Sequence, residues 1–175
     1  MNRKVMRIVS VAAAGIALST SGLAGAGAAG AAQAISSGAS ASLPVYGFLN
    51  GVAATSARNA WAVGDINFSQ SLILHWNGTA WKRVPSPSPP GAQLHGVAAT
   101  SATNAWAVGQ TDTATLILHW NGTAWTRVPS PSPASDTSYL WGVAATARTA
   151  WTVGAAYRSG VPRTLILHWN SAAWK

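Results

Sequence analysis

The chain has 175 residues, a formal net charge of +8 and no cysteine. Three of the basic residues, Arg3, Lys4 and Arg7, lie at the amino terminus, and the others are scattered along the chain. Because the basic residues form no continuous stripe, a dedicated nucleic-acid binder is excluded. Without cysteine, a disulfide framework, a thiolate metal site and a thiol nucleophile are excluded as well.

Residues 1–34 are predicted to form a Sec-type secretory signal peptide. A basic segment over 1–7 precedes an apolar run of about a dozen residues, the usual length for such a signal, and Ala32-Gln33-Ala34 forms a cleavage site of the A-x-A kind. A membrane anchor is the weaker alternative, because a span needs roughly 18–20 apolar residues. We therefore expect a bacterial secreted protein with no membrane span after cleavage, beginning with a flexible leader over 35–48.

Two phrases each occur three times in the rest of the chain. The phrase GVAAT, followed by AWAVG or AWTVG, begins at Gly51, Gly96 and Gly142. The phrase LILHWN begins at Leu72, Leu116 and Leu165. An interval of about 45 residues between equivalent tryptophans indicates a repeat architecture.

Each repeat contains four short segments with the alternating pattern of β-strands. In the first repeat they cover residues 49–55, 60–64, 72–76 and 80–84. Asn77-Gly78 predicts a two-residue type I′ hairpin turn, which needs positive φ at both positions. Pro85 ends the last strand, because proline cannot donate to the hydrogen-bond ladder. The Pro-Ser runs at 85–89 and 129–133 are interpreted as stiff extended connectors, with O-glycosylation as an alternative.

Four short antiparallel strands in 40–50 residues are typical of a β-propeller blade. The fold is therefore predicted to be all-β, with three four-stranded antiparallel blades over residues 49–93, 94–139 and 140–175, the last one truncated. The first strand of each blade, rich in Gly, Ala and Val, suits the crowded axis, and the tryptophans suit the space between blades. A solenoid or a β-sandwich is the alternative.

Two sequence motifs resemble those of a known family: WAVG on the second strand, and W-N-G-T-A-W in the turn between the third and fourth strands. They resemble secreted bacterial propeller repeats related to kelch and Asp-box modules, over residues 49–174, and this resemblance implies the propeller fold. The turn has Trp76 and Trp120 where the Asp-box pattern has aspartate, and the kelch Gly-Gly pair is missing. No functional residue is therefore carried over from either group.

The number of blades is unusual, because propellers close with about four to eight blades and this chain has three. Three explanations stay open: a piece of a longer gene product, copies that assemble into a ring, or a fan that stays open. An open fan leaves sheet edges bare, which favours association. The segment 43–48 is a candidate closing strand for the truncated third repeat.

The three copies differ mainly in two loops that lie at the same end of a blade, which predicts one variable face. The residue before the first-strand glycine also varies, being Asn50, His95 or Trp141. Together with Phe68, Tyr157 and Arg158 from the loops, these residues form the candidate ligand-binding surface. The alternative is loop variation without a ligand.

Nine of the ten tryptophans recur at equivalent positions, which predicts core packing with each indole N–H bonded to a carbonyl; sugar-binding platforms are the alternative. Trp141 stands outside this pattern and is the best single candidate for a contact residue. His75, His119 and His168 also recur. We expect each to make a structural hydrogen bond and not to bind a metal, since one histidine per blade cannot surround one ion.

The sequence has no glutamate, no supported pair of acids and no nucleophile motif, so no catalytic residue, metal or cofactor is predicted. We expect a secreted, non-enzymatic binding module whose partner is a glycan, a cell-wall component or a protein, with a homo-oligomer as one arrangement. A scaffolding fragment of a larger extracellular protein is the alternative. A propeller-type glycan hydrolase is the weakest hypothesis.

Overall fold

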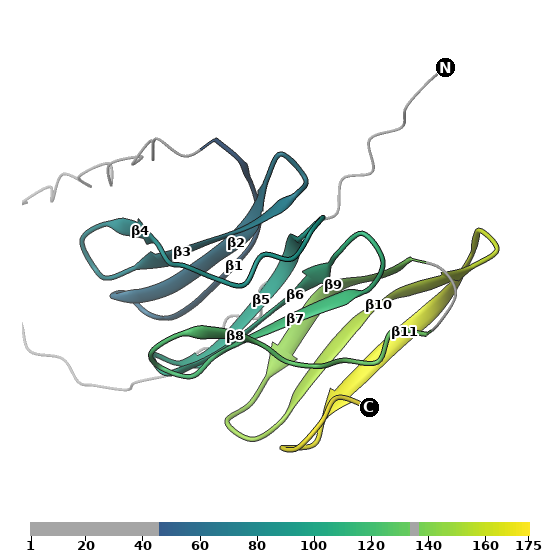
Figure 1. Ribbon diagram of the computed structural model, residues 1–175. Helices are drawn as coiled ribbons and strands as arrows, with labels where there is room; N and C mark the ends of the chain where they lie inside the picture. Colours follow the sequence, from purple (N-terminus) through teal and green to yellow (C-terminus); the bar gives the residue numbers. More distant parts are fainter. Residues whose placement is uncertain (1–45, 134–136) are drawn as a thin grey trace, which may run out of the picture. The chain divides into compact units, whose positions relative to one another are not determined.

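The computed structural model describes residues 46–133 and 137–175, which form three antiparallel sheets in chain order (Figure 1). The predicted signal peptide, its cleavage site and most of the leader lie outside these residues. All eleven secondary-structure elements of the described residues are strands. No helix there is long and apolar enough to cross a membrane.

Each sheet corresponds to one sequence repeat, and we call the sheets blades 1, 2 and 3. Blade 1 contains β1 (Phe48–Ser56), β2 (Asn59–Ile66), β3 (Gln70–Trp76) and β4 (Trp81–Arg83). Blade 2 contains β5 (Gln93–Ser101), β6 (Asn104–Gln110), β7 (Thr115–Trp120) and β8 (Trp125–Arg127). Blade 3 contains β9 (Ser138–Ala145), β10 (Ala150–Arg158) and β11 (Val161–Trp169). In every blade each strand pairs with the next one along the chain.

The predicted antiparallel blades are confirmed, and the third blade is shorter at its outer edge. Its fourth strand is reduced to a bridge between Trp169 and Trp174 and to two backbone hydrogen bonds between His168 and Lys175. Phe48, placed by the sequence at the end of a candidate closing strand, instead begins β1 and pairs with Asp65. Tyr46 and Gly47 are described but are not in a strand, and residues 43–45 lie outside the described residues.

The predicted type I′ turn at Asn77-Gly78 is wrong. Asn77 is not among the residues with positive φ, whereas Gly78 has a φ of 96°. The Asn77 side chain explains the difference, because its Oδ1 accepts hydrogen bonds from the backbone N–H groups of Thr79 and Ala80, both at 3.0 Å. This side-chain cap stabilises a four-residue connection between Trp76 and Trp81 in place of a two-residue turn.

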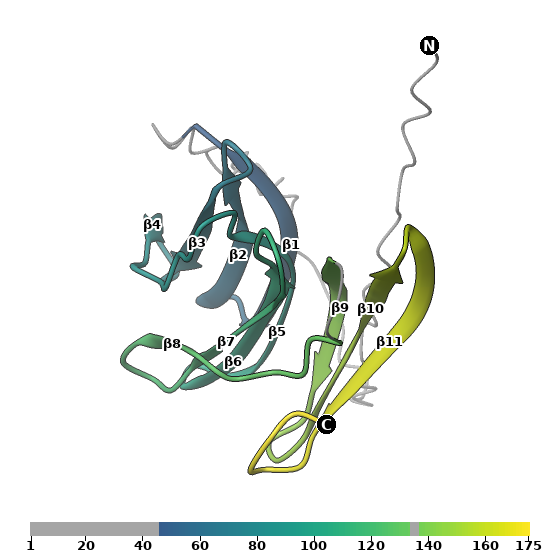
Figure 2. The same cartoon turned by 45° about the vertical axis from the view of Figure 1, so that its right-hand side comes forward.

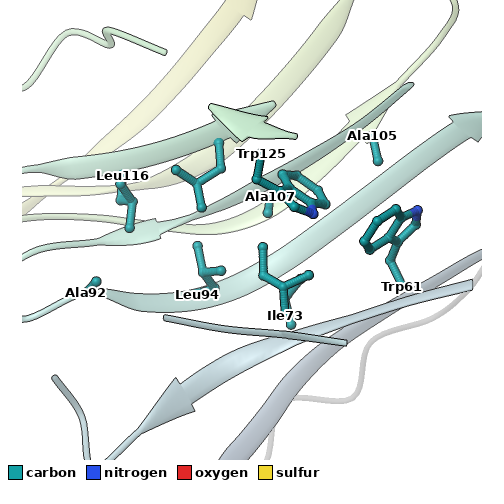
Figure 3. Packing of buried hydrophobic residues seen from close by; sticks show 10 residues of the cluster. Trp61, Ile73, Ala92, Leu94, Ala105, Ala107, Leu116 and Trp125 are labelled. Carbon is teal, nitrogen blue, oxygen red and sulfur yellow. The ribbon is translucent and has the colours of Figure 1, made fainter. Parts of the chain in front are cut away.

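The hydrophobic core lies between the sheets, where one blade inserts three apolar side chains into the next. Trp61, Val63 and Ile73 of blade 1 are fully buried against blade 2 (Figure 3). They contact a set of apolar residues from all four strands of blade 2 and its leading loop: Ala92, Leu94, Ala105, Ala107, Leu116, Leu118 and Trp125. Burial of large apolar side chains on both sides makes this seam the main source of stability between neighbouring blades.

The same seam recurs between blades 2 and 3. Trp106, Val108 and Ile117 are the inserted side chains there. They pack on Leu140, Ala150, Leu165, Leu167 and Trp174 of blade 3. The repeated sequence therefore produces a repeated interface, and the predicted packing role of the regular tryptophans is confirmed for both seams.

Two indole N–H groups make the predicted hydrogen bond to a backbone carbonyl, and three buried ones do not. The Nε1–H groups of Trp76 and Trp120 donate to backbone carbonyl oxygens, each at 3.0 Å. The buried Nε1 atoms of Trp61, Trp125 and Trp174 have no hydrogen-bond partner among the described residues. These rings lie inside the seams, among other aromatic rings and aliphatic side chains.

The first strands of the blades, β1, β5 and β9, lie side by side (Figures 1 and 2). A methyl group added at Gly51 would lie 2.9 Å from the carbonyl oxygen of His95, and one added at Gly96 would lie 2.7 Å from that of Trp141. Only glycine permits this approach of neighbouring backbones. The small residues of the first strands therefore allow close contact at the inner edges of the blades, as the sequence predicts.

Candidate functional site

The three variable residues that precede the first-strand glycines all occupy β-bulges. In β1 the pairing register shifts between Leu49 and Gly51, which leaves Asn50 out of the ladder. His95 in β5 is skipped in the same way, and so is Trp141 in β9. A bulge turns one side chain away from the regular alternation and is common beside binding sites. The sequence reveals the variable position, but the bulge depends on strand pairing.

The close approach of the inner strands brings these bulged positions onto neighbouring segments. Asn50 of blade 1 donates through Nδ2 to the carbonyl oxygen of Leu94 in blade 2 at 2.9 Å. The carbonyl groups of His95 and Trp141 lie against Gly51 and Gly96 of the preceding blades. Asn50, His95 and Trp141 therefore follow one another across the three inner strands.

Asp65 links Asn50 to the β2–β3 loop, a role that sequence reasoning missed. Its side chain is only 2% exposed, and its two oxygens accept from different partners. Oδ2 accepts from Asn50 Nδ2 at 3.3 Å, and Oδ1 accepts from the backbone N–H of Phe68 at 2.8 Å. In the strand register Asp65 lies opposite Phe48, so its hydrogen bond to Asn50 becomes visible only with the bulge at Asn50.

Phe68 is held exposed in an uncommon backbone conformation. Its φ is 56° and that of Asn67 is 51°, a region that bulky residues seldom occupy. The Phe68 side chain is 60% exposed and stacks on Phe48 with a centroid distance of 5.1 Å. Gln93 of blade 2 donates to the Phe68 carbonyl oxygen at 3.1 Å. Surrounding contacts therefore maintain this turn with an aromatic side chain in solvent, an arrangement often found at binding sites.

In blade 2 the bulged residue pairs with a polar neighbour on the next strand. His95 Nε2 lies 3.2 Å from Oε1 of Gln110, a residue that the sequence did not single out. Both side chains are half-buried. The pair supplies a polar segment between the aromatic ends of the surface, since imidazole and amide groups both donate and accept hydrogen bonds.

Blade 3 contributes an aromatic cluster around Trp141. The Trp141 ring is 45% exposed and lies parallel to that of Tyr139, with planes 2° apart and centroids 6.5 Å apart. Tyr139 also meets Tyr157 edge to face at 5.5 Å. Arg158, at the end of β10, is exposed beyond Tyr157. The structure thus gathers Trp141 and Tyr157 through Tyr139, a residue that the sequence analysis did not select.

The Pro-Ser connectors are tied to the blades by hydroxyl groups. Thr115 Oγ1 lies 2.7 Å from Ser130 Oγ and 2.9 Å from Ser132 Oγ. In blade 1, Ser71 Oγ lies 3.0 Å from Ser86 Oγ, and the backbone N–H of Ser71 donates to Ser88 Oγ at 2.9 Å. A shallow hollow of about 380 Å³ lies beside the connector of blade 1, lined by Gln70, Ser71, Arg83, Val84, Pro85, Ser86 and Ser88. None of the bulged residues lines it, so we regard it as separate from the candidate surface.

The recurring histidines make structural hydrogen bonds, as predicted. His75 and His119 each place Nε2 2.7 Å from an asparagine Oδ1, of Asn59 and Asn104 respectively. His168 meets Thr149 Oγ1 at 2.6 Å. Burial lowers the pKa of His75 and of His119 below the usual histidine value. Over residues 46–133 and 137–175 no three His, Cys, Asp or Glu side chains gather where they could hold a metal ion.

Comparison with known proteins identifies the fold but no family. No family model matches the chain, and no curated protein matches it. Eleven solved chains are similar, among them the β-propeller protein described as "YCF48 bound to D1 peptide", with a TM-score of 0.55 and 15% identity. The match covers 76% of this chain and 41% of that one, so the described blades correspond to about two fifths of the neighbour's length. The blades are of the β-propeller type.

Proposed function

We propose that this protein is a secreted, non-enzymatic binding module that holds a peptide segment of another protein on the surface around Asn50, His95 and Trp141. The observation that carries the proposal is the bulge that occurs at one position in all three blades with a different side chain each time. A constant scaffold that presents variable side chains at equivalent points is typical of recognition surfaces.

The chemistry of the surface favours a peptide. Exposed aromatic rings stand in blades 1 and 3, at Phe68 and Trp141, and suit apolar side chains. Between them, Asn50, His95 and Gln110 carry amide and imidazole groups that suit the N–H and C=O groups of a peptide backbone. The structural neighbour was solved with a bound peptide, which supports the same class of ligand for this chain.

A glycan is the second candidate ligand. The parallel rings of Tyr139 and Trp141 favour it, because the apolar face of a sugar ring packs on exposed aromatic rings. The polar groups of blade 2 would then bind sugar hydroxyls. Separate peptide and glycan probes distinguish the two ligands.

Secretion and the absence of catalysis rest on the sequence. The predicted signal peptide supports export of the chain from a bacterial cell. The absence of glutamate supports a non-enzymatic role, and Asp65, the acid at the candidate surface, already accepts two hydrogen bonds within blade 1. A scaffolding role without a ligand is the competing proposal, and it predicts that no probe binds.

The test is a binding screen of the full chain on immobilised peptide and glycan arrays. The wild-type protein is compared with Trp141→Ala and Arg158→Ala, and Arg148→Ala serves as the matched control. Arg148 is an exposed arginine of the same blade, but it lies in the turn at the opposite end of the strands. Truncating an aromatic contact at the centre of a surface weakens binding by about 10-fold or more.

The expected result is binding to one peptide class that Trp141→Ala and Arg158→Ala reduce and Arg148→Ala leaves unchanged. Binding only to glycans, with the same dependence on Trp141, would replace the peptide by the second candidate. No binding on either array, or equal losses for Arg158→Ala and Arg148→Ala, would contradict the proposed surface.

A further inference from the structure

The side of blade 3 that faces away from blade 2 exposes three large apolar side chains, which we call the trailing face. Trp151, Val153 and Ile166 are 50%, 49% and 61% exposed. Their equivalents in blade 1 (Trp61, Val63, Ile73) and in blade 2 (Trp106, Val108, Ile117) are buried, at 3% exposure or less. The trailing face therefore has the composition of an interface whose other half is missing from the described residues.

The opposite end of the described blades carries the other half, which we call the leading face. Leu49 and Val52 of β1 are 54% and 70% exposed, and Trp81 of β4 is half-buried. Their equivalents in blade 2 are Leu94, Val97 and Trp125, which pack against the inserted side chains of blade 1. In blade 3 the inserted side chains of blade 2 pack on the equivalent residues Leu140, Val143 and Trp174. The leading face thus corresponds to a surface that receives a trailing face twice within the chain. It is open at Leu49 and Val52, whereas its Ala62, Leu72 and Leu74 are already buried, at 6%, 2% and 2% exposure.

The backbone at the end of blade 3 also has room for another inner strand. A methyl group added at Gly51 or Gly96 would meet the backbone of the next blade. At Gly142, the equivalent position, it would meet only a methyl group of Val153 within the same blade, at 3.3 Å. The glycine that permits close approach is present, but the described residues supply no strand to approach it.

We propose that two copies of this chain associate head to tail, the trailing face of each packing on the leading face of the other. This inference goes beyond the proposed function and concerns different residues. The partner is a second copy because that copy carries the surface to which the equivalent side chains bind inside the chain. The described residues of two copies contribute six blades, within the range of about four to eight in closed propellers, and those of three copies would contribute nine.

The two contacts of such a dimer are identical, because a two-fold rotation relates them, and each joins two different faces. Each contact repeats the arrangement of the internal seams, in which a second-strand tryptophan packs on the third-strand and fourth-strand tryptophans of the next blade. In the dimer Trp151 would pack between Trp76 and Trp81 of the second copy. This geometry explains why both faces keep the full set of apolar residues.

Sedimentation of the full chain over a range of concentrations tests the proposal. The wild type is expected to sediment as two chains and to dissociate on dilution. Ile166→Lys places a charge in the centre of the trailing face and is expected to raise the dimer dissociation constant about 100-fold or more. Val161→Lys is the matched control, because Val161 lies on the same strand with 60% exposure but has no counterpart in either seam.

Mixing two variants tests the head-to-tail arrangement itself. Ile166→Lys damages the trailing face and Val52→Lys damages the leading face, so each variant alone has both contacts damaged. A mixed dimer keeps one intact contact, and the mixture is expected to associate at least about 10-fold more tightly than either variant alone. Pairing of like faces predicts no such recovery in the mixture.

Circular dichroism confirms that each variant is folded, and Val52→Lys decides the question if Ile166→Lys fails to fold. A wild-type chain that stays monomeric at every concentration would overturn the proposal. A dimer that Ile166→Lys and Val161→Lys weaken equally, or a mixture that does not recover association, would overturn it as well.

Discussion

The indole ring of Trp61 stands perpendicular to that of Trp125, with centroids 5.1 Å apart and planes 89° apart. Trp106 and Trp174 repeat this relationship in the next seam, at 5.2 Å and 90°. Edge-to-face packing of this kind adds to the stabilisation from apolar burial. Trp151 occupies the equivalent position in blade 3, where its one ring contact within residues 46–133 and 137–175 is with His168, at 4.0 Å. Chemically equal tryptophans therefore have unequal roles, which the first prediction tests.

Trp61→Ala is expected to lower the free energy of unfolding by about 3–5 kcal/mol, because it removes a fully buried side chain and leaves a cavity. Trp151→Ala should cost roughly half of that or less at protein concentrations where the chain is monomeric, since the ring is 50% exposed. Urea unfolding of both variants measures the difference. Equal losses would show that Trp151 is buried in solution by something else.

Gly96→Ala is expected to destabilise the chain by about 1–3 kcal/mol, because the new methyl group would press on the carbonyl of Trp141. Gly142→Ala is the matched control at the equivalent position and should cost less in the monomer, since a flexible Val153 side chain is its nearest neighbour. Thermal unfolding at low concentration measures both variants. A greater loss for Gly142→Ala would contradict the described contacts of the inner strands.

Thr115→Val keeps the shape of a buried side chain and removes the hydroxyl group that contacts Ser130 and Ser132. We expect a loss of about 1–2 kcal/mol, because the serine hydroxyls lose a partner, and faster proteolysis of the connector over 129–133. Limited proteolysis and urea unfolding measure these effects. Thr126→Val, at an exposed threonine of β8, should leave both quantities unchanged.

The lowered pKa of His75 and His119 predicts a pH dependence of stability. Burial favours the neutral rings in the folded state, so the unfolded chain binds more protons once the pH falls below the unfolded value of about 6.5. The contribution of these histidines to stability is therefore complete above that pH and decreases as the pH falls towards their folded pKa. NMR titration of the two rings, with unfolding curves at pH 7 and pH 5, measures it. His119→Gln should flatten the dependence; an unchanged slope would contradict it.

Phe68→Gly is expected to change the free energy of unfolding by less than about 1 kcal/mol, because relief of the positive φ offsets the lost stacking on Phe48. Phe68→Ala loses the stacking and keeps most of the strain, so it should be the less stable of the two. Both variants should bind the peptide ligand more weakly than the wild type. Thermal unfolding and the peptide array measure these properties. Phe68→Ala being the more stable variant would contradict the strained turn.

Local chemistry explains which predictions from the sequence succeed. The strands follow from alternation and from the glycine and proline residues between them, so the four strands predicted for the first repeat are confirmed. The turn at Asn77-Gly78 was wrong because a side-chain hydrogen bond to the backbone competes with the two-residue turn. Asn50, His95 and Trp141 were recognised as variable positions, whereas their bulges, and the bond from Asn50 to Asp65, arise from pairing between distant segments.

The amino-acid sequence by itself determined the repeated blade, its four-strand pattern and the tryptophans that fill the seams, because periodicity and residue size act within one repeat. Only the tertiary structure decided which copies of these residues are buried. The second-strand tryptophans Trp61 and Trp106 are covered by the next blade, whereas the equivalent Trp151 of the last described blade is 50% exposed. The exposure of Trp151 and Val52 is therefore a property of position in the series of blades and not of the residues themselves.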